Sequence, residues 1–106
     1  MANMTCCEFD DFLKAMADET RRRILVLLQE GEMNVSELTE RLSVTQPTIS
    51  HHLAILRHAN LVTLRREGQQ RFYRANPACV IECCGELLTR FSISRDLLRP
   101  ERNNDQ

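Results

Sequence analysis

The stretch "VSELTERLSVTQPTISHHLAILRHAN", residues 35–60, contains two apolar patterns of helical spacing that are separated by only three residues. The first pattern predicts a short helix with Ser36 as its N-cap and with Leu38 and Leu42 on its buried face. The letters "SVT" form a tight connection. The second pattern predicts a helix with Pro47 in its first turn, where a missing N–H costs little. Its buried stripe consists of Ile49, Leu53 and Leu56.

The segment after these two helices changes its hydrophobic period. Residues 61–75 read "LVTLRREGQQRFYRA", in which apolar and polar residues alternate on both sides of "REGQ". A period of two predicts two short strands, and Gly68 suits the turn between them. The segment therefore predicts a β-hairpin.

Further helices flank the central segment. Two are predicted before residue 35, and the second of them has Asp18 as its N-cap and Gly31 at its end. Residues 77–98 predict a long last helix. Asn76-Pro77 marks its start, and Pro100 stops it. Residues 99–106 are polar and are expected to form a mobile tail.

This order of elements is that of a winged helix-turn-helix, with the helix-turn-helix at residues 36–59 and the wing at residues 61–75. The fold class is mainly α with a β-hairpin wing. A chain of 106 residues is long enough for one domain with a modest core. We expect a single winged-helix domain over residues 1–106.

Charge is distributed unevenly along the chain. Residues 1–20 hold five acids and one base, and residues 41–75 hold six arginines and one acid, although the whole chain carries a net charge of only −1. A basic segment of this kind suits a phosphate-binding face. The alternative is a solvated protein surface, and a winged helix that binds only other proteins remains a distant alternative.

The second helix of a helix-turn-helix enters the major groove of duplex DNA, where its N-terminal residues meet base edges. Small donors and acceptors lie there, and glutamine can read adenine through two hydrogen bonds. Arginines on the hairpin are placed to meet phosphates or the minor groove. The candidate DNA-binding residues are Thr45, Gln46, Thr48, Ser50, His51, Arg65, Arg66 and Arg71.

Three segments together resemble the ArsR/SmtB family of bacterial metal-sensing repressors. They are "ADETRRRILVLL", "SELTERLSVTQPTISHHLAILRHANLV" and "RREGQQRFYRAN", and the resemblance spans roughly residues 9–90. It implies a homodimeric repressor whose first and last helices form the dimer interface. It also implies that inducer binding releases the protein from its operator DNA.

Two sensing sites of the family have no counterpart here. Arsenic- and cadmium-sensing members resemble "ELCVCDL" at the start of their third helix, but Asn34 and Ser36 stand at the two thiol positions of this chain. Zinc- and nickel-sensing members carry histidines on the last helix, and residues 77–98 contain none. Ions that need imidazole are therefore disfavoured, and soft thiophilic ions remain.

Cysteines supply the remaining candidate site. Cys79 and Cys83 lie one turn apart and about 40° apart around a helix, so they share a face, whereas Cys84 lies about 100° from Cys83. One helix cannot aim all three sulfurs at one ion, and the N-terminal arm, residues 1–7, is the candidate for a further ligand. The predicted metal-binding residues are Cys6, Cys7, Cys79, Cys83 and Cys84.

Three thiolates without nitrogen suit As(III) as inducer, with Sb(III), Cd(II), Pb(II) and Hg(II) as alternatives. The same thiols could instead form a redox or sulfide-responsive switch, or could be small packing residues. A thiol enzyme is disfavoured, because no C-x-x-C and no histidine near a cysteine is present. We expect no enzyme activity and no organic cofactor.

The remaining expectations concern location. The chain has no apolar run of the roughly 18–20 residues that a membrane span needs, and its acidic start is unlike a signal peptide. Its five cysteines are too few for a disulfide scaffold. The predicted location is the cytoplasm, with no membrane partner and with thiols kept reduced.

Overall fold

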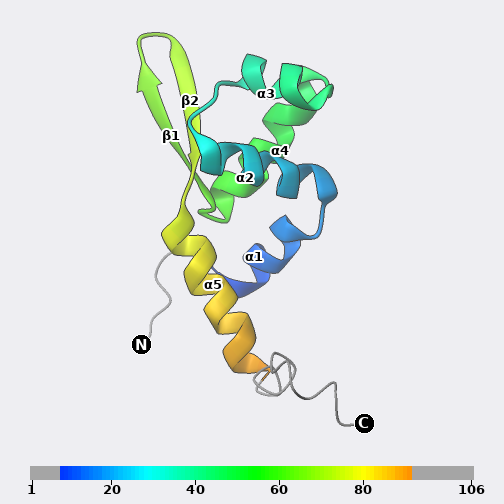
Figure 1. Ribbon diagram of the computed structural model, residues 1–106, viewed down its shortest axis with the longest axis vertical. Coiled ribbons are helices and arrows are strands. Elements are labelled where there is room, and N and C mark those ends of the chain that lie inside the picture. Colours follow the sequence, from blue (N-terminus) through cyan, green and yellow to red (C-terminus); the bar gives the residue numbers. More distant parts are fainter. Residues whose placement is uncertain (1–7, 92–106) are drawn as a thin grey trace.

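The computed structural model describes residues 8–91, which fold into five helices and one hairpin (Figure 1). In chain order the elements are α1 (Phe9–Met16), α2 (Glu19–Glu30), α3 (Val35–Leu42), α4 (Gln46–His58), β1 (Val62–Glu67), β2 (Gln70–Ala75) and α5 (Pro77–Arg90). The predicted class, mainly α with a β-hairpin wing, is confirmed. The arm at residues 1–7 and the tail at residues 99–106 lie outside the described residues.

Helix α3 begins at Val35, and its N-cap is Asn34, two residues before the predicted cap Ser36. Asn34 has an extended backbone, and its side-chain oxygen accepts a hydrogen bond from the backbone N–H of Glu37 at 2.8 Å. The carboxylate of Glu37 accepts in return from the backbone N–H of Asn34 at 2.9 Å. This reciprocal pair is a capping box. The cap at Ser36 was wrong because Ser36 already lies inside the first helical turn.

Helix α5 ends at Arg90, with Phe91 as its C-cap, whereas the sequence predicted a helix over residues 77–98. Residues 92–98 lie outside the described residues. The other predicted ends agree with the structure. The side chain of Asp18 caps α2, Gly31 ends it, and Pro47 lies in the first turn of α4.

The core forms around α4. One side of this helix is buried, because Ile49, Leu53 and Leu56 are 0–1% exposed. The buried residues that surround this stripe come from α1, α2, α3, the wing and α5; the fully buried ones include Ile24, Leu38 and Leu61. The flank of α4 next to this stripe, with Gln46, Ser50 and Arg57, is exposed.

The wing is a two-stranded antiparallel hairpin that extends beyond the helical core (Figure 1). Gly68 takes a φ of +62° in its turn, a backbone conformation that favours glycine. On its other side β2 pairs with the loop between α2 and α3. The backbones of Met33 and Tyr73 exchange two hydrogen bonds of 3.0 and 2.9 Å. The wing is therefore joined to the segment that leads into α3.

Replacing Asn34 with alanine should lower the free energy of unfolding by about 1 kcal/mol, the usual value of an N-cap. The reason is the loss of the oxygen that accepts from Glu37. Urea denaturation followed by circular dichroism measures the change. Asn34→Ser is the matched control, because its hydroxyl can still cap the helix. Equal losses in both variants would contradict the capping role.

Candidate nucleic-acid interface and thiol positions

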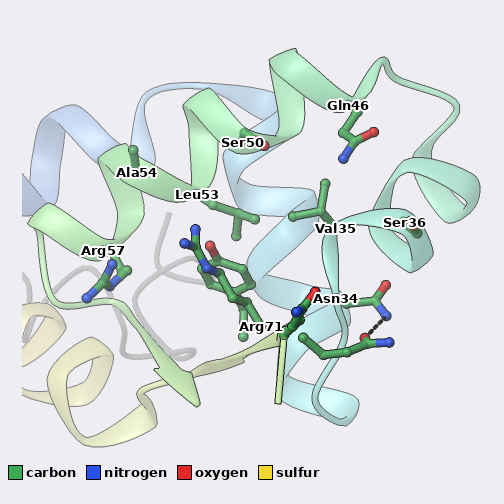
Figure 2. A pocket seen from close by; sticks show the side chains of 12 residues that line it. Asn34, Val35, Ser36, Gln46, Ser50, Leu53, Ala54, Arg57 and Arg71 are labelled. Carbon is green, nitrogen blue, oxygen red and sulfur yellow. Dashed lines mark hydrogen bonds between the residues drawn. The ribbon is translucent and has the colours of Figure 1, made fainter. Parts of the chain in front are cut away.

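A groove of about 680 Å³ lies between the exposed side of α4 and the wing (Figure 2). Gln46, Ser50 and Arg57 line it from α4, and Arg71 lines it from β2. Asn34, at the start of α3, lines its far end. The helix-turn-helix and the wing thus form one concavity, which carries polar and basic side chains beside apolar ones.

The start of α4 presents short polar side chains to solvent. Thr45, Gln46, Thr48 and Ser50 are all exposed, as the sequence predicted. The hydroxyl of Thr45 donates to the hydroxyl of Thr48 at 2.9 Å and makes no cap bond to the helix backbone. These groups are available to base edges, which are read through hydrogen bonds.

Two wing arginines point in the same direction. Arg66 on β1 pairs in register with Arg71 on β2, and Arg71 lines the groove. Two cations directly opposite each other in an antiparallel pair are unfavourable. A phosphate placed between them would remove that repulsion, so this pair suits a DNA backbone.

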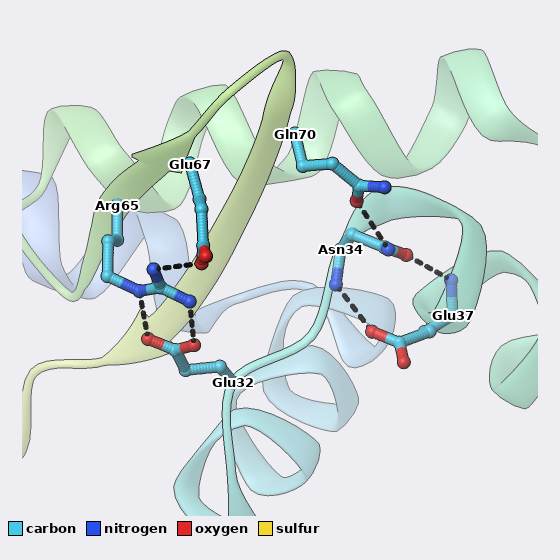
Figure 3. Close-up of polar contacts among 6 residues, drawn as sticks. All are labelled: Glu32, Asn34, Glu37, Arg65, Glu67 and Gln70. Atoms are coloured by element: carbon cyan, nitrogen blue, oxygen red, sulfur yellow. Dashed lines mark hydrogen bonds and ion pairs between the residues drawn. The ribbon is translucent and has the colours of Figure 1, made fainter.

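Arg65 lies on the other face of the wing, because alternate residues of a strand point to opposite faces. Its guanidinium donates two hydrogen bonds to the carboxylate of Glu32, at 2.9 and 2.8 Å, and one to the carboxylate of Glu67, at 2.7 Å (Figure 3). It also lies 4.9 Å from the ring centre of Phe72. The hydrogen bond from Arg65 holds the pKa of the Glu32 carboxyl below its usual value, and the same contact raises the pKa of Arg65.

The charge of Arg65 is therefore offset by two carboxylates, and the residue fastens the wing to the α2–α3 loop. The amide of Asn34 adds a second link, since it donates to the side-chain oxygen of Gln70 at 3.3 Å (Figure 3). The predicted phosphate contact of Arg65 stays a prediction. Within residues 8–91, Arg66 and Arg71 form no ion pair with a carboxylate, whereas Arg65 forms two.

His51 faces away from the wing. With His58 it lines a second, smaller groove between α4 and α1, where His58 Nε2 lies 3.6 Å from the carboxylate of Asp11. Ala54 lines both grooves, so it forms the ridge between them. His51 is exposed, but its predicted contact with DNA would be made from a different flank than that of Gln46.

Arg57 is a groove residue that the sequence indicated only as part of a basic segment. It lies on the same side of α4 as Gln46 and Ser50. The signal was present in the spacing, because positions 46, 50 and 57 fall within about 40° of one another around a helix. The side of α4 that faces the wing depends on tertiary packing, which the spacing alone does not supply.

The three described cysteines divide as the helical spacing predicted. Cys79 and Cys83 are fully buried on one face of α5, and Cys84 is an exposed free thiol on another. Cys83 is disulfide-bonded in this structure. Within residues 8–91 no group of three or more potential ligands is close enough to hold a metal ion. Cys6 and Cys7 lie outside the described residues.

The fold and the groove define a winged helix-turn-helix DNA-binding protein. A family model described as "Bacterial regulatory protein, arsR family" matches residues 18–63. The chain is 40% identical over 67 residues to the transcriptional repressor SdpR of Bacillus subtilis, and the match covers 63% of this chain and 74% of SdpR.

Two further similar proteins are named for arsenic resistance. The chain is 49% identical over 65 residues to the arsenic resistance transcriptional regulator ArsR1 of Pseudomonas putida. The match covers 60% of this chain and only 51% of ArsR1. A crystal structure of a possible transcriptional regulator for arsenical resistance has 32% identity and a TM-score of 0.70, with 82% of this chain and 93% of that chain covered. The chain belongs to the ArsR family, as a DNA-binding transcriptional repressor and not an enzyme. No helix within residues 8–91 has the length and apolar character needed to cross a membrane.

Replacing Arg66 and Arg71 together with alanine should weaken binding to every duplex sequence, because phosphate contacts do not depend on sequence. The slope of log affinity against log salt should fall by roughly 2, about 0.9 for each phosphate that is no longer neutralised. Fluorescence anisotropy at several salt concentrations measures both. Arg74→Ala is the matched control, since Arg74 lies on the opposite face, near Glu32. An unchanged slope in the double variant would exclude this pair from the interface.

Replacing Gln46 or Ser50 with alanine should reduce discrimination between operator and random DNA. A good base contact is worth roughly 1–3 kcal/mol, and these exposed side chains are not part of the core. Competition binding with both DNAs measures the ratio of affinities. The salt slope should stay at its wild-type value, and a loss that is equal on both DNAs would argue against base readout.

Proposed function

We propose that the protein is a homodimeric repressor that binds operator DNA and leaves it when cysteine thiolates bind a soft metal(loid), most suitably As(III). The observation that carries the DNA part is the groove between α4 and the wing. It combines base-reading side chains at Gln46 and Ser50 with a basic rim at Arg57 and Arg71. Base-edge groups can read sequence, and the basic rim can position the DNA backbone.

Exposed apolar residues support the dimer. Ile81, Leu88 and Phe91 on and just after α5 are 70%, 47% and 59% exposed, and Leu13 on α1 is 40% exposed. Helices α1 and α5 pack on each other, so these residues lie on neighbouring elements. A second copy of the chain would remove this apolar surface from water. Two recognition helices would then face half-sites about one DNA turn apart.

The buried face of α5 supports the thiol site. Cys79 and Cys83 share this face, and the same helix packs on α1, which directly follows the arm that carries Cys6 and Cys7. We therefore assign two ligands to Cys79 and Cys83 and the third to the arm. A cellular thiol would first have to reduce the disulfide of Cys83. As(OH)₃ would then exchange its three hydroxides for three sulfurs, and the three thiol protons would leave in three waters. A divalent ion such as Cd(II) would instead release these protons into solution.

The choice of a soft ion rests on the donors. The histidines of the chain all lie on α4, and no imidazole is on α5. Thiolates without nitrogen favour As(III), Sb(III), Cd(II), Pb(II) or Hg(II) over zinc. Two of the similar proteins are named for arsenic resistance, whereas SdpR is not. As(III) is accordingly the first inducer to test.

A thiol redox switch is the second candidate, because Cys83 is disulfide-bonded and Cys84 is an exposed free thiol in this structure. In that case oxidation, and not an ion, would change the packing of α5. The same residues serve both proposals, so the experiment must separate an ion from an oxidant.

In an operator gel shift under reducing conditions, As(III) should release wild-type protein at lower concentration than Zn(II). Cys83→Ser and Cys79→Ser should keep their DNA affinity and lose the response, since each removes one of three sulfurs. The double variant Cys6→Ser/Cys7→Ser should behave in the same way. Cys84→Ser is the matched control on the same helix, and it should respond as wild type does.

Three outcomes would overturn parts of this proposal. Release by peroxide but not by As(III) would favour the redox switch. Loss of response in Cys84→Ser alone would show that the ligand set is wrong. A variant with all five cysteines replaced by serine that still left DNA on addition of As(III) would end the thiol proposal and leave the cysteines as packing residues.

A further inference from the structure

Helices α1 and α2 meet at a corner (Figure 1). There the side chain of Arg21 on α2 contacts both α1 and α4. Its Nε donates to the backbone carbonyl of Ala15 at 2.8 Å, and one terminal nitrogen donates to the carbonyl of Lys14 at 3.1 Å. These carbonyls lie in the last turn of α1, where helical donors run out; the carbonyl of Lys14 also accepts from the backbone N–H of Ala17 at 3.2 Å. The other terminal nitrogen lies 3.1 Å from Nδ1 of His52, on α4.

The contact with Arg21 fixes the protonation state of His52. Arginine carries only donors and keeps its charge, so Nδ1 of His52 must accept the hydrogen bond. An imidazole that accepts at Nδ1 is neutral and carries its proton on Nε2. A second proton on Nδ1 would place two donors and two positive charges face to face. The tie between Arg21 and His52 therefore exists only while His52 is neutral.

The surroundings of His52 favour this neutral form. Partial burial lowers the pKa of His52 below 6.5, and the positive charges of Arg21 and His51 lower it further, while Asp18 raises it. Asp18 is the acidic group that faces His52 from the corner, and it also caps α2 through the backbone N–H of Arg21. As the pH falls, the imidazole of His52 is protonated in the unfolded chain before it is protonated in the folded protein. The hydrogen bond to Arg21 therefore contributes fully to the free energy of unfolding above pH about 6.5. This contribution is lost as the pH falls through the lower pKa of His52 in the folded protein.

We propose that Arg21 is a positioning residue that holds the recognition helix α4 to the end of α1 through neutral His52, and that protonation of His52 releases this tie and weakens operator binding. The inference rests on the proposed function, because α1 is the helix that follows the thiol arm and carries Leu13 of the apolar surface. A movement of α1 would be passed to α4 by a single guanidinium that touches both helices.

The test compares operator affinity at pH 7.5 and pH 5.5 in wild type and in His52→Asn. The side-chain oxygen of asparagine can accept from Arg21 in place of Nδ1, but it does not titrate. We expect both proteins to bind alike at pH 7.5. Between the two pH values, wild type should lose roughly tenfold more affinity than the variant, which is the size of one hydrogen bond to a charged group. Equal pH profiles would overturn the proposal.

His58→Asn is the matched control, because His58 lies on the same helix, faces Asp11 at 3.6 Å and makes no hydrogen bond to Arg21 within residues 8–91. It should keep the wild-type loss. If His51 or His58 contacted phosphates, acid would strengthen binding, so the sign of the change separates the two roles. Arg21→Lys keeps the charge but cannot reach both α1 carbonyls and His52 at once. It should bind weakly at both pH values, and wild-type binding would contradict the positioning role.

A second readout needs no DNA. Nitrogen-15 NMR of the imidazoles in the free protein should show His52 with its proton on Nε2 and a pKa lowered from 6.5. In Arg21→Lys this lowering of the His52 pKa should be smaller. Failure of the proposed function would appear as no operator binding at any pH, whereas failure of this inference would leave binding intact and the His52 signal ordinary.

Discussion

The burial of one side of α4 is the constraint on which the remaining structure depends. Replacing a buried leucine with alanine in a protein core costs about 2–5 kcal/mol. Leu53 and Leu56 are each at most 1% exposed, so the helix cannot rotate without losing a large part of the roughly 5–15 kcal/mol that stabilises a typical domain. With its rotation fixed, Gln46, Ser50 and Arg57 face the wing and Ala54 becomes the ridge between two grooves.

The three wing arginines divide into two roles because a strand alternates its faces. Arg66 and Arg71 lie side by side on the groove face, where their repulsion makes an anionic partner favourable. Arg65 is on the other face, bound to Glu32 and Glu67, and joins the hairpin to the α2–α3 loop. A positive charge in a basic segment is thus no guide to DNA contact until its carboxylate partners are known.

The proposed sensing and DNA-binding regions lie at opposite ends of the described structure and share α1. On one side α1 packs on α5, which carries Cys79 and Cys83, and on the other it is held to α4 through Arg21. The positions that hold thiols in some related sensors are used differently here. Asn34 caps α3 and reaches Gln70 of the wing, so this segment serves the position of the wing and offers no sulfur.

The element order, the helix-turn-helix and wing, the buried stripe of α4, and the separation of Cys84 from Cys83 were all predictable from the sequence, because they follow from local periods of 3.6 and 2 residues. The cap of α3 was wrong in detail, since it was predicted at Ser36 and lies at Asn34. Only the tertiary structure decided which charges are paired. Arg65 meets Glu32 across 33 residues of sequence, and Arg21 meets His52 across 31. Such contacts depend on how the helices and strands pack. Local sequence patterns carry no information about which residues more than 30 positions apart come together.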